Sequence, residues 1–382
     1  MADRLVPPVG TQPPELAALR AEVREFLARQ IADGVFTPSV DTWLTRWDQQ
    51  FTKALAEQGW VGMTIPVEYG GRGRTFLERF VVTEELLAVG APVAAHWVAD
   101  RQAAPSLLKY GTEAQKQRFL PRIAAGDICW AIGMSESESG SDLASVRTKA
   151  VAVEGGWQIN GTKLWTSGAH LADAFFALAR SAPLDPAHRH DGLSQFIVLL
   201  DSPGITIRPI HTMSGDHHFN EVIMEEVFVA DELVLGHVGA GWQQVTSELG
   251  FERSGPERFM STFPLLAEAL DLISSGELPR TPEVGRLVAR MSALHRMSLS
   301  VAQALARGDN ADLSASVVKT LGTRLEGDVA ETIEELAGDA VARGGRFGEL
   351  LRAGLMQRPG FTLRGGTTEI LDGVISRGLG MR

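Results

Sequence analysis

The chain has 382 residues, of which 44% are hydrophobic, and a formal net charge of −11. This length exceeds one ordinary domain, and the apolar content is enough to build more than one core. Attraction to phosphate requires clustered excess lysine and arginine, so the acidic balance argues against a general nucleic-acid or anionic-membrane surface.

The N-terminal third of the chain has helical periodicity. Residues 15–31 follow Pro13-Pro14 and place Leu16, Leu19 and Val23 at helical spacing. Further helices are predicted at residues 44–58, 76–89, 91–110 and 113–123, separated by turns that contain glycine or proline. The pattern predicts an all-α domain over residues 1–126.

From Ile128 the pattern changes to short runs typical of β-strands. These runs lie at residues 146–153, 157–159, 175–179, 196–200, 205–210 and 222–229. They predict a middle β-sheet domain over residues 127–236. Helical periodicity returns after Gly236, with interruptions near Gly276 and Gly308, and predicts a C-terminal helical bundle over residues 237–382. The expected fold class is α+β.

The single cysteine and the N-terminal residues indicate the cellular compartment in which we expect the protein. Cys129 lies between Ile128 and Trp130, so we expect it to be packed rather than nucleophilic, in a reducing environment. The sequence has no run of roughly 18 apolar residues, the length of a membrane span. The first residues lack the apolar region of a signal peptide. We expect a cytoplasmic protein with no membrane span.

The most informative segment is Ile132-Gly-Met-Ser-Glu-Ser-Glu-Ser-Gly-Ser-Asp142. Its glycine lets a ligand approach the backbone closely, and hydroxyl groups stand beside it at Ser135, Ser139 and Ser141. Taken alone, a run of serine, glycine and glutamate is most often a surface turn.

A second block, Asn160-Gly-Thr-Lys-Leu-Trp-Thr-Ser167, follows at short distance. The indole of Trp165 can stack on a tricyclic ring, and the hydroxyls of Thr166 and Ser167 can bond its polar edge. Asn-Gly alone is most often a hairpin tip. We expect the two blocks to lie on neighbouring strands and to form a flavin cradle.

At these residues the chain resembles the acyl-CoA dehydrogenase family. Its middle domain carries Thr/Ser-Glu-Pro-x-x-Gly-Ser-Asp and then Asn-Gly-x-Lys-x-Trp-Ile-Thr/Ser; here Ser137 replaces the proline. Similarity extends to residues 65–73, 111–121 and 366–370, in family order.

The resemblance implies FAD as cofactor, with contacts at Ile132, Met134, Ser135, Gly140, Ser141, Trp165, Thr166, Ser167, Thr367 and Glu369. It also implies that Ser141 contributes to substrate binding. Thr367 also has the pattern of a cap for a helix starting near Thr368.

Dehydrogenation of an acyl thioester needs a base for the α-proton, a hydride acceptor and donors to the thioester carbonyl. Many family members carry the base two residues before the threonine of Glu-Gly-Thr, but that position is Gly365 here. Long-chain and isovaleryl members carry it ten residues beyond the aromatic residue of a Gly-x-Gly-Phe/Trp turn. Counted from Trp242, this position is Glu252, followed by Arg253. The resemblance implies Glu252 as base, Arg253 near CoA and the Gly365 amide as carbonyl donor; the alternatives are a solvated Glu252 or Glu257 as base.

Pro256 lies four residues after Glu252. Because proline has no N–H, it cannot bond the carbonyl of Glu252, and a continuous helix would be kinked there.

Two other site types are not favoured by the sequence. The pairs His188/His190 and His217/His218 lack a third and fourth ligand at suitable spacing, so we predict no metal site. Gly239-Ala-Gly241 does not follow a strand in a βαβ unit, which excludes a Rossmann fingerprint.

Two family elements that reach FAD across a subunit interface are not recognisable. The regions expected to carry Arg-x-x-Phe-Gly and Gln-x-x-Gly-Gly-x-Gly are residues 272–280 and 339–346. The resemblance therefore leaves open a divergent homo-oligomer, dimer or tetramer, and a heteromer with a homologous chain.

The function implied is FAD-dependent conversion of an acyl-CoA to a trans-2-enoyl-CoA, with electrons passed to an electron-transfer flavoprotein. One alternative is a supporting or partner-dependent subunit of a heteromeric acyl-CoA dehydrogenase, such as those acting on sterol side chains. Another is an oxidase or a nitrogen-oxidising enzyme on the same scaffold.

Overall fold

The computed structural model describes residues 13–253, 255–338 and 344–381, with the side chains of residues 249–252 outside the described part. The chain forms two compact units. The β unit comprises Trp47–Arg74 and Ala94–Phe251, and the helical unit comprises Met1–Arg46, Thr75–Val93 and Glu252–Arg382. Each unit contains parts of more than one of the three predicted domains, and the predicted domain ranges stay predictions.

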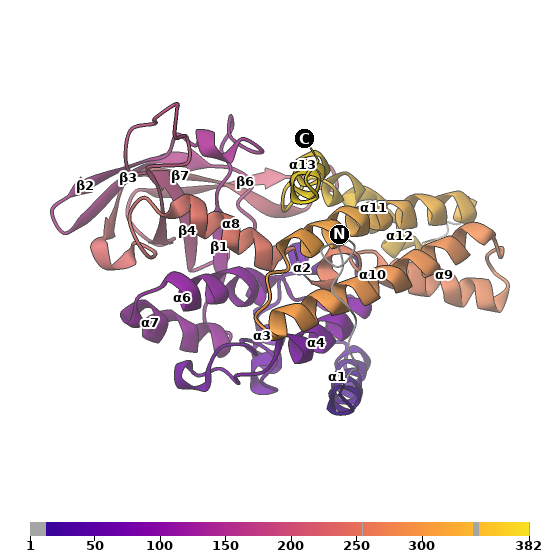
Figure 1. Cartoon of the computed structure of the whole chain (residues 1–382). Helices are drawn as coiled ribbons and strands as arrows, with labels where there is room; N and C mark the ends of the chain where they lie inside the picture. The colour runs from indigo at the N-terminus through magenta and orange to yellow at the C-terminus, as the bar shows by residue number, and fades with distance from the viewer. Residues whose placement is uncertain (1–12, 254, 339–343, 382) are drawn as a thin grey trace. The chain divides into compact units, whose positions relative to one another are not determined.

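The β unit contains a seven-stranded sheet in the order β1-β4-β2-β3-β7-β6, with β5 paired to β4 (Figure 1). The strands are β1 (Trp130–Gly133), β2 (Lys149–Val153), β3 (Gly156–Lys163), β4 (Ala174–Arg180), β5 (Leu193–Leu199), β6 (Ile205–His211) and β7 (His217–Ala230). Each of the six predicted strand segments overlaps one of them. The central strand β4 is buried from Ala174 to Ala179, the continuous apolar run expected of a strand covered on both faces.

The strands that carry the two sequence blocks, β1 and β3, are not neighbours in the sheet. β1 pairs in parallel with β4, whereas β3 pairs with β2 and β7. The expectation of neighbouring strands is therefore wrong, because β4 and β2 stand between β1 and β3. The contact is made by the segments that follow the strands: the Leu164 N–H donates to the Ser135 carbonyl at 2.9 Å.

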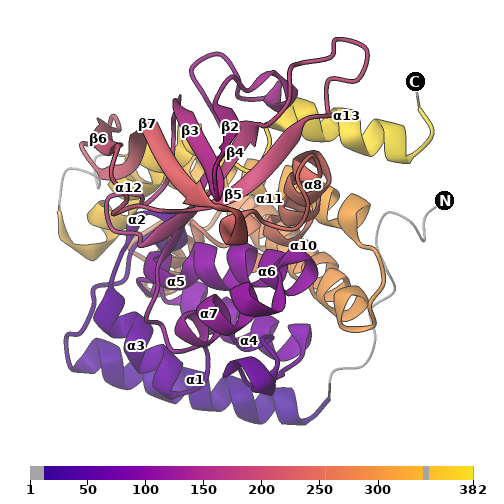
Figure 2. The ribbon, with the colours of Figure 1, turned by 90° about the vertical axis from the view of Figure 1, so that its left-hand side faces the viewer.

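Helices of the β unit pack below the sheet (Figure 2). They are α3 (Gln49–Glu57), α5 (Ala94–Val98), a π-helical turn (Ala99–Ala103), α6 (Ala104–Tyr110) and α7 (Glu113–Ala124). The Phe119 ring of α7 meets the Trp130 ring edge-on at 5.3 Å, and Trp130 meets Phe176 at 5.0 Å. These aromatic contacts connect the helices to β1 and β4 in one core.

Helix α8 (Gly241–Glu252) is fastened to the sheet of the β unit. Gln244 Nε2 donates to the Leu235 carbonyl at 2.6 Å, and Gln195 Nε2 donates to Glu248 Oε2 at 3.2 Å. Val245 packs with Leu178 in a small apolar cluster. These contacts hold the helix that ends at the predicted base.

The kink expected at Pro256 is absent because the helix is not continuous there. α8 ends at Glu252, and Pro256 is the first residue of a 3₁₀ helix (Pro256–Arg258). Proline suits a first position because the N–H it lacks would have no partner within the helix.

The helical unit contains the remaining α-helices. They are α1 (Glu15–Ala32), α2 (Thr42–Thr45), α4 (Phe76–Ala88), α9 (Phe263–Ser275), α10 (Pro282–Ala306), α11 (Asp312–Ala337), α12 (Gly345–Phe361) and α13 (Thr368–Gly378). The helix predicted at residues 44–58 is divided into α2 and α3, because Asp48 accepts from the Phe51 N–H and starts a new helix. The predicted interruptions near Gly276 and Gly308 are confirmed.

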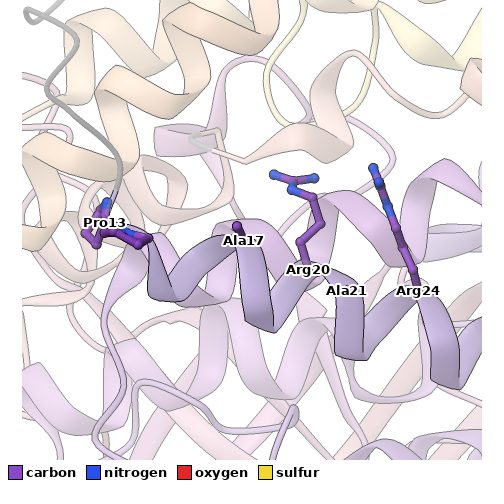
Figure 3. A pocket seen from close by; sticks show the side chains of 6 residues that line it. Pro13, Ala17, Arg20, Ala21 and Arg24 are labelled. Atoms are coloured by element: carbon purple, nitrogen blue, oxygen red, sulfur yellow. The ribbon is translucent and has the colours of Figure 1, made fainter.

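Helices α1 and α4 are joined by ion pairs. Figure 3 shows Arg20 and Arg24 projecting from α1 on the same side. Arg20 pairs with both Glu84 and Glu85 of α4, and Arg24 Nε meets Glu85 Oε2 at 2.6 Å. Within the described ranges, no helix is both long and apolar enough to cross a membrane.

Candidate functional site

Trp165, the aromatic residue of the second block, has an unusual backbone. The residue is 55% exposed, and its φ of 59° lies in the left-handed region that non-glycine residues rarely adopt. The ring contacts Phe219 edge-on, with centroids 5.6 Å apart. An exposed indole on a constrained backbone presents a flat apolar face for a planar ring.

The segment around Trp165 is hydrogen-bonded on both sides. The Leu164 N–H donates to the Ser135 carbonyl, and the Thr166 N–H donates to the Asn220 carbonyl at 3.0 Å. The Asn220 side-chain amide donates to the Thr166 carbonyl at 3.0 Å. These bonds connect both sequence blocks and β7.

A buried ion pair between Lys163 and Glu136 joins the two sequence blocks. Lys163 is fully buried, and its Nζ donates to Glu136 Oε1 at 2.7 Å and to the Met134 carbonyl at 3.1 Å. The Glu136 carboxylate also accepts from the N–H groups of Arg147 and Thr148 and from the Thr148 hydroxyl. Burial raises the pKa of Glu136, but Lys163 and these donors outweigh burial and hold it below its usual range. Burial lowers the pKa of Lys163 to about 8, with Glu136 opposing the shift.

The residues of the first block differ in accessibility. Gly140 and Ser141 are exposed, whereas Ile132, Met134 and Ser135 are partly buried. A Cβ built at Gly140 would meet nothing within 4 Å, so this chain's own packing does not require glycine there. The buried Ser139 donates its hydroxyl to the Asp142 carbonyl at 2.8 Å and shapes the loop.

In the second block, Thr166 and Ser167 have different environments. Thr166 is fully buried and its hydroxyl has no hydrogen-bond partner within the described structure, whereas Ser167 is partly exposed. The hydroxyl contact from Thr166 to FAD therefore stays a prediction, and the structure adds that this side chain is enclosed. Ser167 and the indole of Trp165 fit the polar edge and the face of a flavin.

In the helical unit, the turn before α13 is held by two cations. Gly365 and Gly366 both have positive φ, at 68° and 88°. Arg253 Nε donates to the Gly365 carbonyl at 3.2 Å, and the buried Lys319 Nζ donates to the Gly366 carbonyl at 2.6 Å. Because a trans peptide directs its N–H opposite its carbonyl, these contacts orient the N–H groups of Gly366 and Thr367.

Thr367 caps α13, as predicted, by accepting from the Ile370 N–H. Glu369 lies exposed in the first turn, where a carboxylate is favoured by the helix dipole. Arg253, predicted near CoA, is bonded to the Gly365 carbonyl. Glu252 is the last residue of α8, and its side chain lies outside the described residues.

A buried charged cluster lies directly before this turn. Arg364 donates to both carboxylate oxygens of Asp41 at 2.6 Å and stacks on Trp43, 4.5 Å from the ring centroid. Glu326 is fully buried and accepts from the Ser261 N–H at 2.8 Å. Burial raises the pKa of Glu326 to about 7, with the Arg364 charge opposing it.

Cys129 is buried, and His188 and His190 each contact a neighbouring side chain. Burial, with Asp173 adding to it, raises the pKa of Cys129 to about 12, so its thiolate is not accessible near neutral pH. His188 bonds Asp185, and His190 stacks on Trp242 with centroids 4.0 Å apart. The described residues contain no group of three or more histidine, cysteine, aspartate or glutamate side chains suited to a metal.

Comparison with known proteins identifies the class. Residues 13–127 match the family model for the acyl-CoA dehydrogenase N-terminal domain, and residues 131–227 match that for the middle domain. The chain belongs to the acyl-CoA dehydrogenase family, a class of oxidoreductases. The predicted family and fold class are thereby confirmed.

Among curated relatives, acyl-CoA dehydrogenase FadE34 of Mycobacterium tuberculosis is 33% identical over 95% of this chain and 48% of the relative. The chain thus spans about half the length of that relative. Acyl-CoA dehydrogenase IpdE1 of Mycolicibacterium smegmatis is 33% identical over 95% of this chain and 96% of its own length.

Solved structures show the same fold. The Tcur3481-Tcur3483 steroid ACAD has a TM-score of 0.86 and 29% identity, covering 97% of this chain and 99% of that chain. The ChsE4-ChsE5 complex from Mycobacterium tuberculosis has a TM-score of 0.82 and 26% identity, covering 97% and 99%.

Sequence reasoning missed Asn220 as part of the site. It lies in β7 at a buried position of the alternating pattern shared with Val222 and Met224. An asparagine on the apolar face of a strand must find polar partners, and this was the signal in the sequence.

Removing one partner of the Lys163–Glu136 pair will destabilise the protein strongly. We expect Glu136→Gln to lower the free energy of unfolding by about 3–5 kcal/mol, because a buried lysine loses its counter-charge. Lys163→Met is the reciprocal variant. Chemical denaturation of both single variants and the double variant measures the coupling; a double variant whose loss equals the sum of the singles would contradict the pairing.

The stability of the protein will fall as pH rises through the pKa of Glu326. In the folded state Glu326 keeps its proton up to pH about 7, whereas the usual value is 4.5. The stabilisation is therefore complete below about 4.5 and is lost as pH rises through 7, at up to about 1.4 kcal/mol per pH unit. We expect Glu326→Gln to flatten this dependence in thermal unfolding between pH 5 and 8. Glu335→Gln, on the exposed side of the same helix, is the control; an unchanged slope in Glu326→Gln would contradict the assignment.

Proposed function

We propose that this chain is an FAD-dependent acyl-CoA dehydrogenase that converts an acyl-CoA thioester to a trans-2-enoyl-CoA. The observation that carries the proposal is Trp165, an exposed indole fixed beside the serine- and glycine-rich loop. A planar tricyclic ring fits that indole face, and Ser167 and the exposed Gly140-Ser141 backbone lie within the same two blocks. When bound, FAD supplies the acceptor for the hydride that leaves the β-carbon.

We assign two tasks to residues of the helical unit: removal of the α-proton and hydrogen bonding to the thioester carbonyl. Glu252 takes the α-proton of the substrate on its carboxylate. The Gly365 amide donates to the thioester carbonyl and stabilises the negative charge that develops on its oxygen. Arg253 donates to the Gly365 carbonyl, which belongs to the peptide that follows Gly365, and Arg253 stays assigned to the neighbourhood of CoA.

Electrons leave to an electron-transfer flavoprotein, and the active assembly is an oligomer. Thr367 and Glu369, at the start of α13, are assigned to FAD, since a helix N-terminus favours anionic phosphate. Ser141 is assigned to both FAD and substrate. The substrate class remains an acyl-CoA, and a panel of straight, branched and steroid-side-chain thioesters will rank the acyl groups.

Glu252→Gln tests the base. We expect the variant to retain FAD but to bleach the flavin absorbance about 10²–10⁴ times more slowly than the parent during anaerobic acyl-CoA addition, because the α-proton loses its acceptor. Stopped-flow absorbance on the FAD-loaded protein gives the rate.

Glu257→Gln is the discriminating control. Glu257 is buried in the 3₁₀ helix and its Oε2 has no hydrogen-bond partner within the described part of the chain. We expect bleaching to persist in this variant. Loss of bleaching in Glu257→Gln together with its retention in Glu252→Gln would transfer the base to Glu257.

A partner-dependent subunit is the second candidate function. It is supported by the departures at residues 272–280 and 339–346, of which residues 339–343 lie outside the described structure. It is also supported by likeness to the ChsE4-ChsE5 complex. If a homologous partner completes the FAD site, the chain can bind FAD without its own Arg-x-x-Phe-Gly and Gln-x-x-Gly-Gly-x-Gly segments.

Flavin content separates the two candidates. The chain purified alone is expected to hold FAD if it acts as a homo-oligomer. If it is a partner-dependent subunit, it is expected to lack FAD alone and to hold it when co-expressed with a homologous chain. Size-exclusion chromatography with absorbance at two wavelengths, one for protein and one for flavin, measures both assembly and loading.

A further inference from the structure

The left-handed backbone of Trp165 requires a specific restraint. A bulky aromatic residue rarely has positive φ, and this conformation persists only where neighbouring contacts fix it. The residue is more than half exposed, and its ring forms a T-shaped pair with that of Phe219. Side-chain packing therefore supplies only part of the restraint, and backbone hydrogen bonds supply the rest.

Asn220 provides that restraint through two hydrogen bonds to one residue. Its main-chain carbonyl accepts from the Thr166 N–H at 3.0 Å, and its side-chain Nδ2 donates to the Thr166 carbonyl at 3.0 Å. Since the Thr166 N–H belongs to the peptide that follows Trp165, this arrangement fixes the orientation of that peptide. The left-handed turn at Trp165 is thus tied directly to β7.

The side chain of Asn220 is itself fixed in orientation. It is fully buried, its Oδ1 contacts His217 Nε2 at 2.8 Å, and its Nδ2 also lies 3.0 Å from His170 Nδ1. The Thr166 carbonyl can only accept, so the amide nitrogen must face it. An aspartate at this position would place an oxygen against the Thr166 carbonyl and reverse the interaction from attraction to repulsion.

We propose that Asn220 is a positioning residue for Trp165, which it holds in the orientation that stacks on the isoalloxazine ring of FAD. The inference rests on the cofactor of the proposed function. Asn220 acts through the Thr166 backbone and does not itself touch the cofactor. Its contribution is therefore read in the geometry and affinity of flavin binding.

The test uses Asn220→Asp in the full chain. We expect FAD to bind at least about tenfold more weakly than to the parent, and the fluorescence of bound flavin to rise, because the indole no longer stacks closely on the ring. Asn160→Asp is the matched control, since Asn160 uses its Oδ1 to accept from the Glu226 N–H and an aspartate keeps that acceptor.

A double-variant cycle separates positioning from general destabilisation. If Asn220 acts through the indole, Trp165→Phe and Asn220→Asp will have non-additive effects on FAD affinity. Additive effects, or an Asn220 variant that matches Asn160→Asp in affinity and flavin fluorescence, would overturn the proposal. If Asn220→Asp does not accumulate as folded protein, Asn220→Ser removes the amide without burying a charge.

A cofactor-free readout keeps this test distinct from that of the proposed function. In protein labelled with fluorotryptophan, the ¹⁹F resonance of Trp165 is identified by its loss in Trp165→Phe. We expect it to shift in the Asn220 variants and to stay in place in Asn160→Asp, whether or not FAD is bound. An unshifted resonance in the Asn220 variants would sink the positioning role, whereas failure of the parent to bind FAD would sink only the cofactor assignment.

Discussion

The buried ion pair between Lys163 and Glu136 is the constraint on which the arrangement of the β unit's candidate site depends. A lysine with no exposed side chain is tolerated only where a counter-charge and further acceptors satisfy it. Glu136 meets this need and also accepts from the Arg147 and Thr148 backbone at the approach to β2. Three segments of the β unit therefore meet at one carboxylate, and the Ser135–Leu164 hydrogen bond joins two of them beside it.

Left-handed backbone conformations occur at both places where ligand chemistry is proposed. Trp165 has positive φ without being glycine, and Gly365 and Gly366 form a turn that uses positive φ twice. Each is stabilised by polar groups from distant segments: Asn220 for the first, Arg253 and Lys319 for the second. Restraint of this kind keeps a binding surface in one shape before the ligand arrives, which lowers the ordering cost of binding.

Much of the fold followed from local patterns in the sequence. The six strand segments and the breaks at Gly276 and Gly308 depend on alternation and turn residues, which act over a few positions. The split between α2 and α3 was missed because a single capping residue, Asp48, outweighed continuous helical spacing. The sheet order was also missed, because strand pairing depends on partners far apart in the chain.

The residues of the candidate site also fall into two groups: those identified by local motifs and those whose contacts only the structure shows. The sequence by itself determined the family, the two blocks and the Thr367 cap, because short motifs and helix caps are local properties. Only the tertiary structure decided the inward orientation of Thr166, the bond from Arg253 to Gly365 and the role of Asn220. Asn220 and Thr166 are 54 residues apart, and Arg253 and Gly365 are 112 apart. Contacts at such separations are set by how packed elements meet, which no local periodicity encodes.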